Sequence, residues 1–104
     1  SPVIANNMIM VLEEDGSILS FSLANLAPSW SSEEYSRRQL SNGATFKNLM
    51  LVGDLEGYLH VINPLTGITV GRKKVSGNPI MSIITFRESA YIIDQESNIV
   101  AVTL

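Results

Sequence analysis

The feature that most constrains this chain is an internal repeat of about 40 residues. Three segments share one order: an apolar run, two or three acidic or polar residues, a turn residue and a second apolar run. These segments are residues 8–21, 49–62 and 90–102. Their turn residues, Gly16, Gly57 and Ser97, are 41 and 40 residues apart. A period of this size marks repeat architectures such as solenoids and propellers.

Each repeat predicts a β-hairpin. The flanking runs are rich in β-branched, aromatic and leucine residues, which suit a packed pleated surface. The centres carry Asp15-Gly16, Glu56-Gly57 and Ser97-Asn98, residue pairs that accept tight-turn geometry and positive φ. The hairpins are therefore predicted to turn near Gly16, Gly57 and Ser97.

Shorter extended pieces lie before and after the hairpins. Residues 3–5 and 80–84 precede two of them, and stretches around Trp30 and at 68–75 follow two of them. About four short strands thus fall in each unit of about 40 residues, and no window predicts a convincing amphipathic helix. The repeat units are predicted as residues 1–40, 41–78 and 79–104.

The returning strands carry apolar residues on both faces. One column of aligned positions is Ile18, Leu59 and Ile99. A second column is Phe21, Ile62 and Val102, three residues further along each strand. Positions three apart lie on opposite faces of a strand. A four-stranded antiparallel sheet with two apolar faces is typical of a propeller blade, so we expect an all-β chain of about two and a half blades.

Composition excludes several classes of function. The formal net charge is −3, which argues against a nucleic-acid binder. The chain has no Cys, so it forms no disulfide, thiol nucleophile or thiolate metal site. No apolar run approaches the roughly 18 residues that a membrane-spanning helix needs.

The acidic hairpin tips raise the question of calcium. The three clusters are residues 13–16, 54–57 and 94–96. Each offers only two or three carboxylates, whereas a calcium loop supplies five or more oxygen ligands from a longer, specifically spaced segment. Turn chemistry is therefore the preferred interpretation, and no metal ligand is assigned.

His60 is the one histidine of the chain, so any triad or histidine-based metal site would depend on it. It aligns with Leu19 and Val100 in the middle of a strand, which favours a packed strand residue. There is no Gly-x-Ser-x-Gly elbow, and residues 71–74 lack the pattern of a phosphate loop. The sequence assigns no catalytic or cofactor-binding residue and predicts no cofactor.

Two surface features are candidate binding sites. Arg72-Lys73-Lys74 could meet an acidic partner or anionic lipid, but lysines also protect solvated edge strands. Trp30 and Tyr35, beside Arg37-Arg38, are residue types that anchor interfaces. For the two aromatic residues, packing between blades is the preferred interpretation.

Three strings carry a family resemblance: residues 1–6, the run Gly53–Asn63, and Thr66-Gly67. They resemble the repeats of quinoprotein-like (PQQ-type) β-propellers. Within that group, residues 53–67 and the ending 99–104 resemble the C-terminal part of the BamB family of outer-membrane assembly lipoproteins. The Trp-Asp signature of WD40 propellers is absent, because Trp30 is followed by Ser31.

The resemblance implies a C-terminal piece of a larger, eight-bladed propeller. It implies a non-enzymatic scaffold of the outer-membrane β-barrel assembly machinery, at the periplasmic, inner face of the bacterial outer membrane. Its implied partners are the periplasmic (POTRA) domains of BamA and unfolded outer-membrane proteins. The implied membrane anchor is a lipid on an N-terminal Cys outside this chain. No partner-binding residue is transferred, and the opening Ser1-Pro2 indicates a cut within something longer.

Two alternatives remain open. PQQ-dependent dehydrogenases share this repeat but need a cofactor pocket, a calcium site and commonly a vicinal Cys pair. A propeller binding module of unrelated role is the second, because a repeat pattern does not fix a function.

A third unit that ends at residue 104 holds a preceding strand and a hairpin and lacks its outer strand. We therefore expect unpaired strand edges and partly uncovered blade faces around Ile18, Leu59 and Ile99. Such edges and faces pair with other chains, so the isolated chain is predicted to self-associate.

Overall fold

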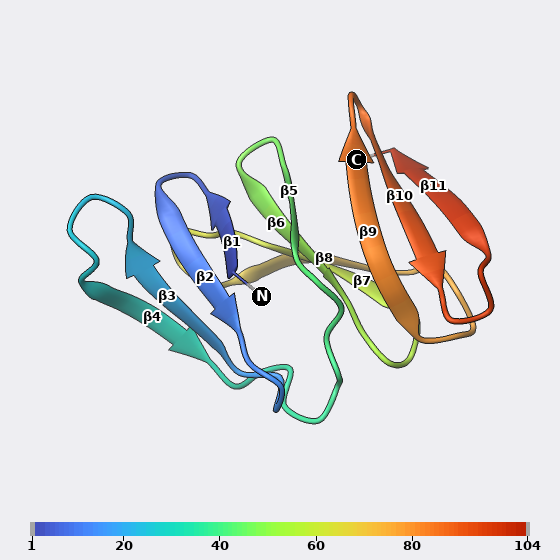
Figure 1. Ribbon diagram of the computed structural model, residues 1–104, viewed down its shortest axis with the longest axis horizontal. Helices are drawn as coiled ribbons and strands as arrows, with labels where there is room; N and C mark the ends of the chain where they lie inside the picture. The colour runs from blue at the N-terminus through green and yellow to red at the C-terminus, as the bar shows by residue number, and fades with distance from the viewer. Residues whose placement is uncertain (1, 104) are drawn as a thin grey trace.

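The chain folds into three antiparallel sheets that stand side by side (Figure 1). The computed structural model describes residues 2–103. The first sheet, blade A, consists of β1 (Pro2–Ala5), β2 (Met8–Leu12), β3 (Ile18–Ser22) and β4 (Pro28–Ser32). The second, blade B, consists of β5 (Ala44–Phe46), β6 (Leu49–Gly53), β7 (Tyr58–Ile62) and β8 (Thr69–Lys74). The third, blade C, consists of β9 (Ile80–Phe86), β10 (Ser89–Asp94) and β11 (Ile99–Thr103).

Within every blade the strands follow one another in chain order, each antiparallel to its neighbour. This arrangement confirms the predicted all-β fold of propeller blades. Blade C has three strands, so its third strand β11 is an edge, as expected for the last unit. The described residues form no helix, and therefore no helix that could cross a membrane.

The three predicted hairpin turns are confirmed. Gly16, Gly57 and Ser97 have φ values of 92°, 89° and 65°. At Gly16 and Gly57, glycine is also required because there is no space for a side chain. A Cβ on Gly16 would lie 2.1 Å from the carbonyl oxygen of Tyr35, and one on Gly57 would lie 2.0 Å from that of Ser76. The backbone that leaves one blade therefore crosses directly over the hairpin turn of that blade.

Two apolar cores fill the joints between the blades. The A–B core contains Val3, Ala5, Met8, Met10, Ile18, Tyr35, Met50, Val52 and Ile62. The B–C core contains Phe46, Leu51, Leu59, Ile80, Ile83, Ala90, Ile92 and Val102. Successive residues of β6 and β7 thus point alternately into the two cores, because side chains alternate across a strand. Blade B is covered on both faces.

The aligned apolar residues Ile18, Leu59 and Ile99 differ in how far they are buried. Ile18 and Leu59 are fully buried, which corrects the expectation that they are partly uncovered. The reason is that each lies on the face that meets the following blade. Ile99 occupies the same position in blade C and is exposed.

Candidate functional site

The best-defined polar site is built around Asp54, in the hairpin turn between β6 and β7. Its carboxylate is completely buried. One oxygen, Oδ1, accepts hydrogen bonds from the backbone amides of Glu56 at 2.9 Å and Tyr58 at 3.0 Å. The other, Oδ2, accepts from Arg38 Nη1 at 3.0 Å and from His60 Nε2 at 2.7 Å. Asp54 therefore closes its own turn and binds the segment that arrives from blade A.

His60 lies on β7, with its ring in the A–B joint. The ring of Tyr35 packs against it, with centroids 4.7 Å apart. Since Nε2 faces the carboxylate of Asp54, Nε2 carries the proton, while the buried Nδ1 has no hydrogen-bond partner. The Tyr35 hydroxyl in turn shares a hydrogen bond with Thr69 of β8. The expected packed strand position of His60 is confirmed, with a polar partner that the sequence did not indicate.

Two opposing effects set the pKa of Asp54. Burial raises it, and this is the largest single effect. The hydrogen bonds from His60, Tyr58, Arg38 and Glu56 act in the other direction and together outweigh burial, so the pKa lies below its ordinary value. The carboxylate is ionised in the folded protein at neutral pH, and it pairs with the Arg38 guanidinium.

Blade C repeats this arrangement with different donors. Asp94 Oδ1 accepts from the amides of Glu96 at 3.0 Å and Asn98 at 2.9 Å. Asp94 Oδ2 accepts from the Ser76 hydroxyl at 2.6 Å, and from the side-chain amides of Asn78 and Asn98. The Ser76 bond, assisted by the other donors against the effect of burial, holds the pKa of Asp94 well below its usual value.

Asp54 and Asp94 thus have the same structural role, and we call each carboxylate, together with the side chains that it binds, a joint latch. In each case a buried turn carboxylate binds side chains from the segment that leaves the preceding blade. Backbone bonds run alongside: Leu55 N donates to Arg38 O at 2.8 Å, and Gln95 N to Pro79 O at 2.8 Å. The acidic hairpin tips of blades B and C therefore carry turn chemistry, as preferred from the sequence.

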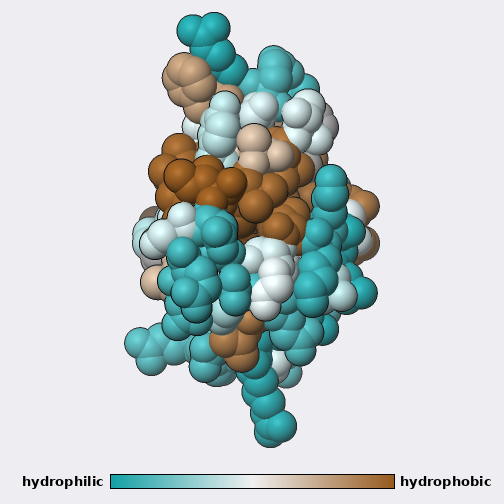
Figure 2. Space-filling model, turned by 90° about the vertical axis from the view of Figure 1, so that its right-hand side faces the viewer, coloured by the Kyte–Doolittle hydropathy of each residue, from teal (hydrophilic) through white to brown (hydrophobic). Residues whose placement is uncertain are grey.

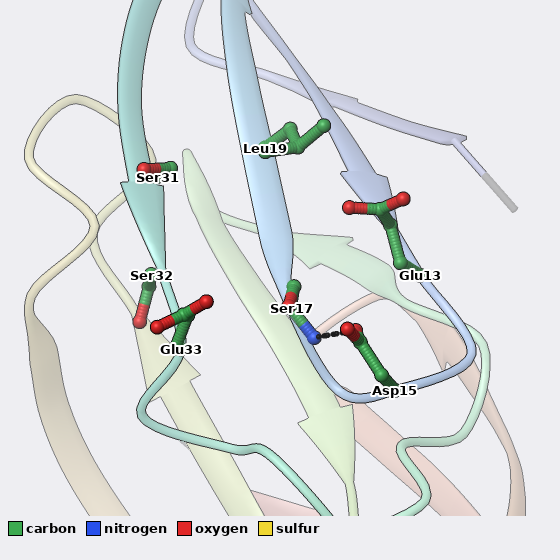
Figure 3. A pocket seen from close by; sticks show the side chains of 7 residues that line it. All are labelled: Glu13, Asp15, Ser17, Leu19, Ser31, Ser32 and Glu33. Carbon is green, nitrogen blue, oxygen red and sulfur yellow. Dashed lines mark hydrogen bonds between the residues drawn. The ribbon is translucent and has the colours of Figure 1, made fainter.

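Blade A has an open groove where the other blades have a latch (Figure 3). The groove has a volume of about 560 Å³. Its lining is Glu13, Asp15, Ser17, Leu19, Ser31, Ser32 and Glu33. Asp15 Oδ1 accepts the amide of Ser17 at 2.8 Å, a bond that lowers the pKa of Asp15. Within residues 2–103, no three acidic or histidine side chains are grouped so that they could hold a metal ion.

The aromatic candidates for an interface, Trp30 and Tyr35, lie at the A–B core. Trp30 of β4 packs against the A–B core, and its Nε1 donates to the Pro64 carbonyl at 2.8 Å. Its ring also occupies the space beside Gly67, where a Cβ would lie 2.5 Å from it. Packing between blades is therefore confirmed for Trp30, and the buried Tyr35 lies in the same core.

The basic cluster Arg72-Lys73-Lys74 is exposed on β8, the edge strand of blade B. Arg72 and Lys74 extend over the ring of Tyr58, with their charges 4.7 Å and 5.3 Å from its centroid. The location agrees with the preferred interpretation of a protected, solvated edge. The polar groups described so far hold the blades together, and none of them brings a nucleophile together with a base in an open cleft.

The chain is similar in sequence to proteins named outer membrane protein assembly factor BamB. The chain is 38% identical over 73 residues to the outer membrane protein assembly factor BamB of Taylorella asinigenitalis, covering 70% of this chain and 19% of that protein. It is 31% identical over 97 residues to BamB of Shewanella oneidensis, covering 92% of this chain and 25% of that protein. The chain therefore spans about a fifth to a quarter of the length of these relatives. No family model matches it.

A solved structure supports the fold. The crystal structure of BamB from Moraxella catarrhalis superposes with a TM-score of 0.88 at 17% sequence identity. The match covers 97% of this chain and 31% of that one. At this identity the likeness concerns the fold alone, and it extends over nearly all of this chain.

Proposed function

We propose that this BamB-like chain is part of a non-enzymatic scaffold in the outer-membrane β-barrel assembly machinery. In this role it binds the periplasmic POTRA domains of BamA and assists the insertion of outer-membrane proteins. It acts at the periplasmic face of the outer membrane, as the C-terminal portion of a lipid-anchored propeller. The observation that carries the proposal is the similarity to proteins named outer membrane protein assembly factor, at 31–38% identity.

The geometry of the polar residues supports a scaffold. Asp54 and Asp94 are buried within turns, and their oxygens accept bonds from the chain itself. His60 is buried in the A–B joint and faces Asp54. A general base must reach a substrate proton, and none of these three side chains is open to one. These groups act by fixing the angle and register of neighbouring blades.

The direct test is binding of the chain to the purified POTRA domains of BamA from the same organism. Titration calorimetry at micromolar concentration is expected to show saturable binding. Circular dichroism of the same sample checks that the β-fold is intact. A folded chain that shows no heat of binding and no retention on immobilised POTRA domains would refute the proposal.

Two matched charge reversals locate the surface. Lys73→Glu changes the basic edge of blade B, and Glu33→Lys changes the acidic groove of blade A; both side chains are exposed. The variant that weakens POTRA binding several-fold marks the docking side.

The dehydrogenase alternative is tested by adding PQQ and calcium to the chain. Stoichiometric uptake of the cofactor absorbance would favour that enzyme class over the scaffold.

A further inference from the structure

The outer strand of blade B, β8, is the edge of a blade that has a neighbour on each face. The A–B and B–C cores cover the two faces of this blade, so what remains exposed on it lies outside both joints. Within residues 2–103, β8 pairs with one strand only, β7. The side of blade C seen in Figure 2 is different, because a hydrophobic band of the kind that packs inside a joint crosses its middle. The edge of blade B instead ends in three successive exposed cations, residues 72–74.

Four of the seven Lys and Arg residues of the chain gather at this end of blade B. Three of them are residues 72–74 on β8 itself. The fourth, Arg38, arrives from the segment that leaves blade A and pairs with Asp54, whose Oδ1 accepts the amide of Tyr58 on β7. Tyr58 lies opposite Lys74 in the sheet. Two basic runs that are distant in the sequence thus meet here, although the net charge of the chain is −3.

Two tyrosines show how close these cations are to one another. Burial is the largest effect on the pKa of Tyr35 and raises it, while the positive charges of Arg38 and Arg72 both act to lower it. The charges of Arg72 and Lys74 lie 4.7 Å and 5.3 Å from the centroid of the Tyr58 ring. Stacking on an aromatic ring holds a cationic side chain in place while it keeps its charge. Because Arg72 and Lys74 are alternate residues of one strand, they present two positioned charges on one face of the edge.

The edge is regular where the cations lie. The pairing of β7 with β8 shifts between Val61 and Ile62. From there on Gly71 pairs with Val61 and Lys74 pairs with Tyr58, with no shift between them. This regular stretch presents outward backbone groups to an added strand, because alternate groups of an edge strand have no partner in their own sheet.

The cations select what an added strand carries. Lysines on an edge strand keep other sheet edges away, as in the solvated edge described above. The same charges attract a strand with carboxylates, because opposite charges across two strands stabilise the pair and like charges destabilise it. We propose that the edge at residues 71–74 docks an extended acidic segment of a partner protein. This segment adds as a further strand of blade B, with its carboxylates beside Arg72 and Lys74.

The surroundings of the edge favour a protein segment over an anionic membrane. At the start of β8, the Thr69 hydroxyl donates to the carboxylate of Glu34 at 3.3 Å. Glu56 is exposed in the turn before β7. A flat anionic bilayer would meet these carboxylates together with the overall negative charge of the chain, and like charges repel. A segment one strand wide meets the edge alone.

This docking edge and the proposed assembly role can fail separately. Docking requires an acidic extended segment and does not require that BamA supplies it. A synthetic peptide stands in for the partner, so its binding is measured without POTRA domains. Loss of one kind of binding with the other retained therefore shows which of the two is wrong.

Fluorescence anisotropy of a labelled peptide tests the docking. The peptide alternates Val and Glu and is long enough to span the six residues of β8, and the control peptide has Gln in place of every Glu. At low ionic strength we expect the Glu peptide to bind the folded chain at least about tenfold more tightly than the Gln peptide. Binding should weaken as salt is added, because salt screens exposed charges. Equal affinity for the two peptides, or affinity that salt leaves unchanged, would contradict the proposal.

Two matched double charge reversals locate the site. Arg72→Glu with Lys74→Glu removes the two stacked cations, and we expect the affinity for the Glu peptide to fall at least about tenfold. Lys47→Glu with Arg87→Glu makes the same change in net charge on the β5–β6 and β9–β10 turns, where both side chains are exposed. We expect that control to stay within about twofold, because exposed charges away from the site are screened. An equal loss in both variants, each with the β-fold by circular dichroism, would assign the binding to net charge and refute a site on β8.

Vesicles of phosphatidylglycerol test the membrane alternative. We expect them to leave the anisotropy of the bound Glu peptide unchanged, because the flanking carboxylates oppose a flat anionic surface. Displacement of the peptide by these vesicles, without displacement by vesicles of zwitterionic lipid, would assign the edge to a membrane surface and overturn the proposal.

Hydrogen exchange tests whether the peptide adds as a strand. Backbone amides among residues 71–74 should exchange more slowly when the Glu peptide is bound, because an added strand accepts their hydrogen bonds. The amides of the edge strand β4 serve as the control and should not change, since β4 carries no cation. Unchanged exchange at residues 71–74 with the peptide bound would refute the added strand.

Discussion

Replacing Asp54 by Ala is expected to remove the joint latch between blades A and B. Four hydrogen bonds end on this carboxylate, two from its own turn and two from Arg38 and His60. Removing one partner of a buried ion pair typically costs about 3 to 5 kcal/mol, because the remaining groups stay desolvated and unpaired. We expect a loss of about 4 kcal/mol for Asp54→Ala. That is a large fraction of the roughly 5 to 15 kcal/mol by which small domains are stable.

Urea unfolding followed by Trp30 fluorescence measures this loss, since the one tryptophan lies at the A–B joint. The midpoint of unfolding should fall markedly for Asp54→Ala. Asp15→Ala is the control, because Asp15 is exposed in the equivalent turn and accepts a bond from Ser17 alone. Its midpoint should change far less. Equal midpoints for wild type and Asp54→Ala would show that the latch contributes nothing and would refute the reasoning.

Three further outcomes are expected. Because the pKa values of Asp54 and Asp94 are lowered in the folded state, the stabilisation that these carboxylates give the fold is full above pH about 4 and is lost as the pH falls further. Melting temperatures measured from pH 7 to pH 2 should show this loss. The Asp54→Ala variant should show a smaller decrease in melting temperature over the same range. Gly57→Ala should destabilise the fold by about 2 kcal/mol or more, because the residue has a positive φ and its new Cβ would collide with a backbone carbonyl. Gly77→Ala is the control, because nothing lies close to that position, and its stability in urea titrations should stay within about 0.5 kcal/mol of the wild type. Replacing His60 with Gln or Leu should leave POTRA affinity within a few-fold while lowering the urea midpoint, and complete loss of binding by a folded variant would show that this buried side chain has a direct role.

The local features of the fold could be predicted because they depend on neighbouring residues. The turns at Gly16, Gly57 and Ser97 need only their own φ angles and flanking apolar runs. The assignment of both strand faces as apolar was also correct, because alternation is a property of each strand alone. What was wrong was the burial of Ile18 and Leu59, since burial depends on which blade follows.

The joint latch could not be predicted, because it connects distant parts of the chain. Arg38 lies 16 residues before Asp54 in an irregular segment with no periodicity. His60 aligned with Leu19 and Val100, so its position indicated packing and gave no sign of a polar partner. One signal was present: Asp54 and Asp94 occupy equivalent positions in the repeat. A carboxylate that recurs at one turn position is a candidate for a shared structural bond.

The two latches use the same acceptor but different donors, and this difference gives each joint its identity. Apolar faces alone would allow any blade face to pack on any other, because hydrophobic contact is non-directional. Asp54 requires Arg38 and His60, whereas Asp94 requires Ser76 and two asparagines. In blade A the aligned carboxylate belongs to Glu13, which is exposed, and Asp15 accepts the amide of Ser17 within the turn. The donors of each latch therefore determine which segment a turn carboxylate binds, whereas the apolar faces supply burial without direction.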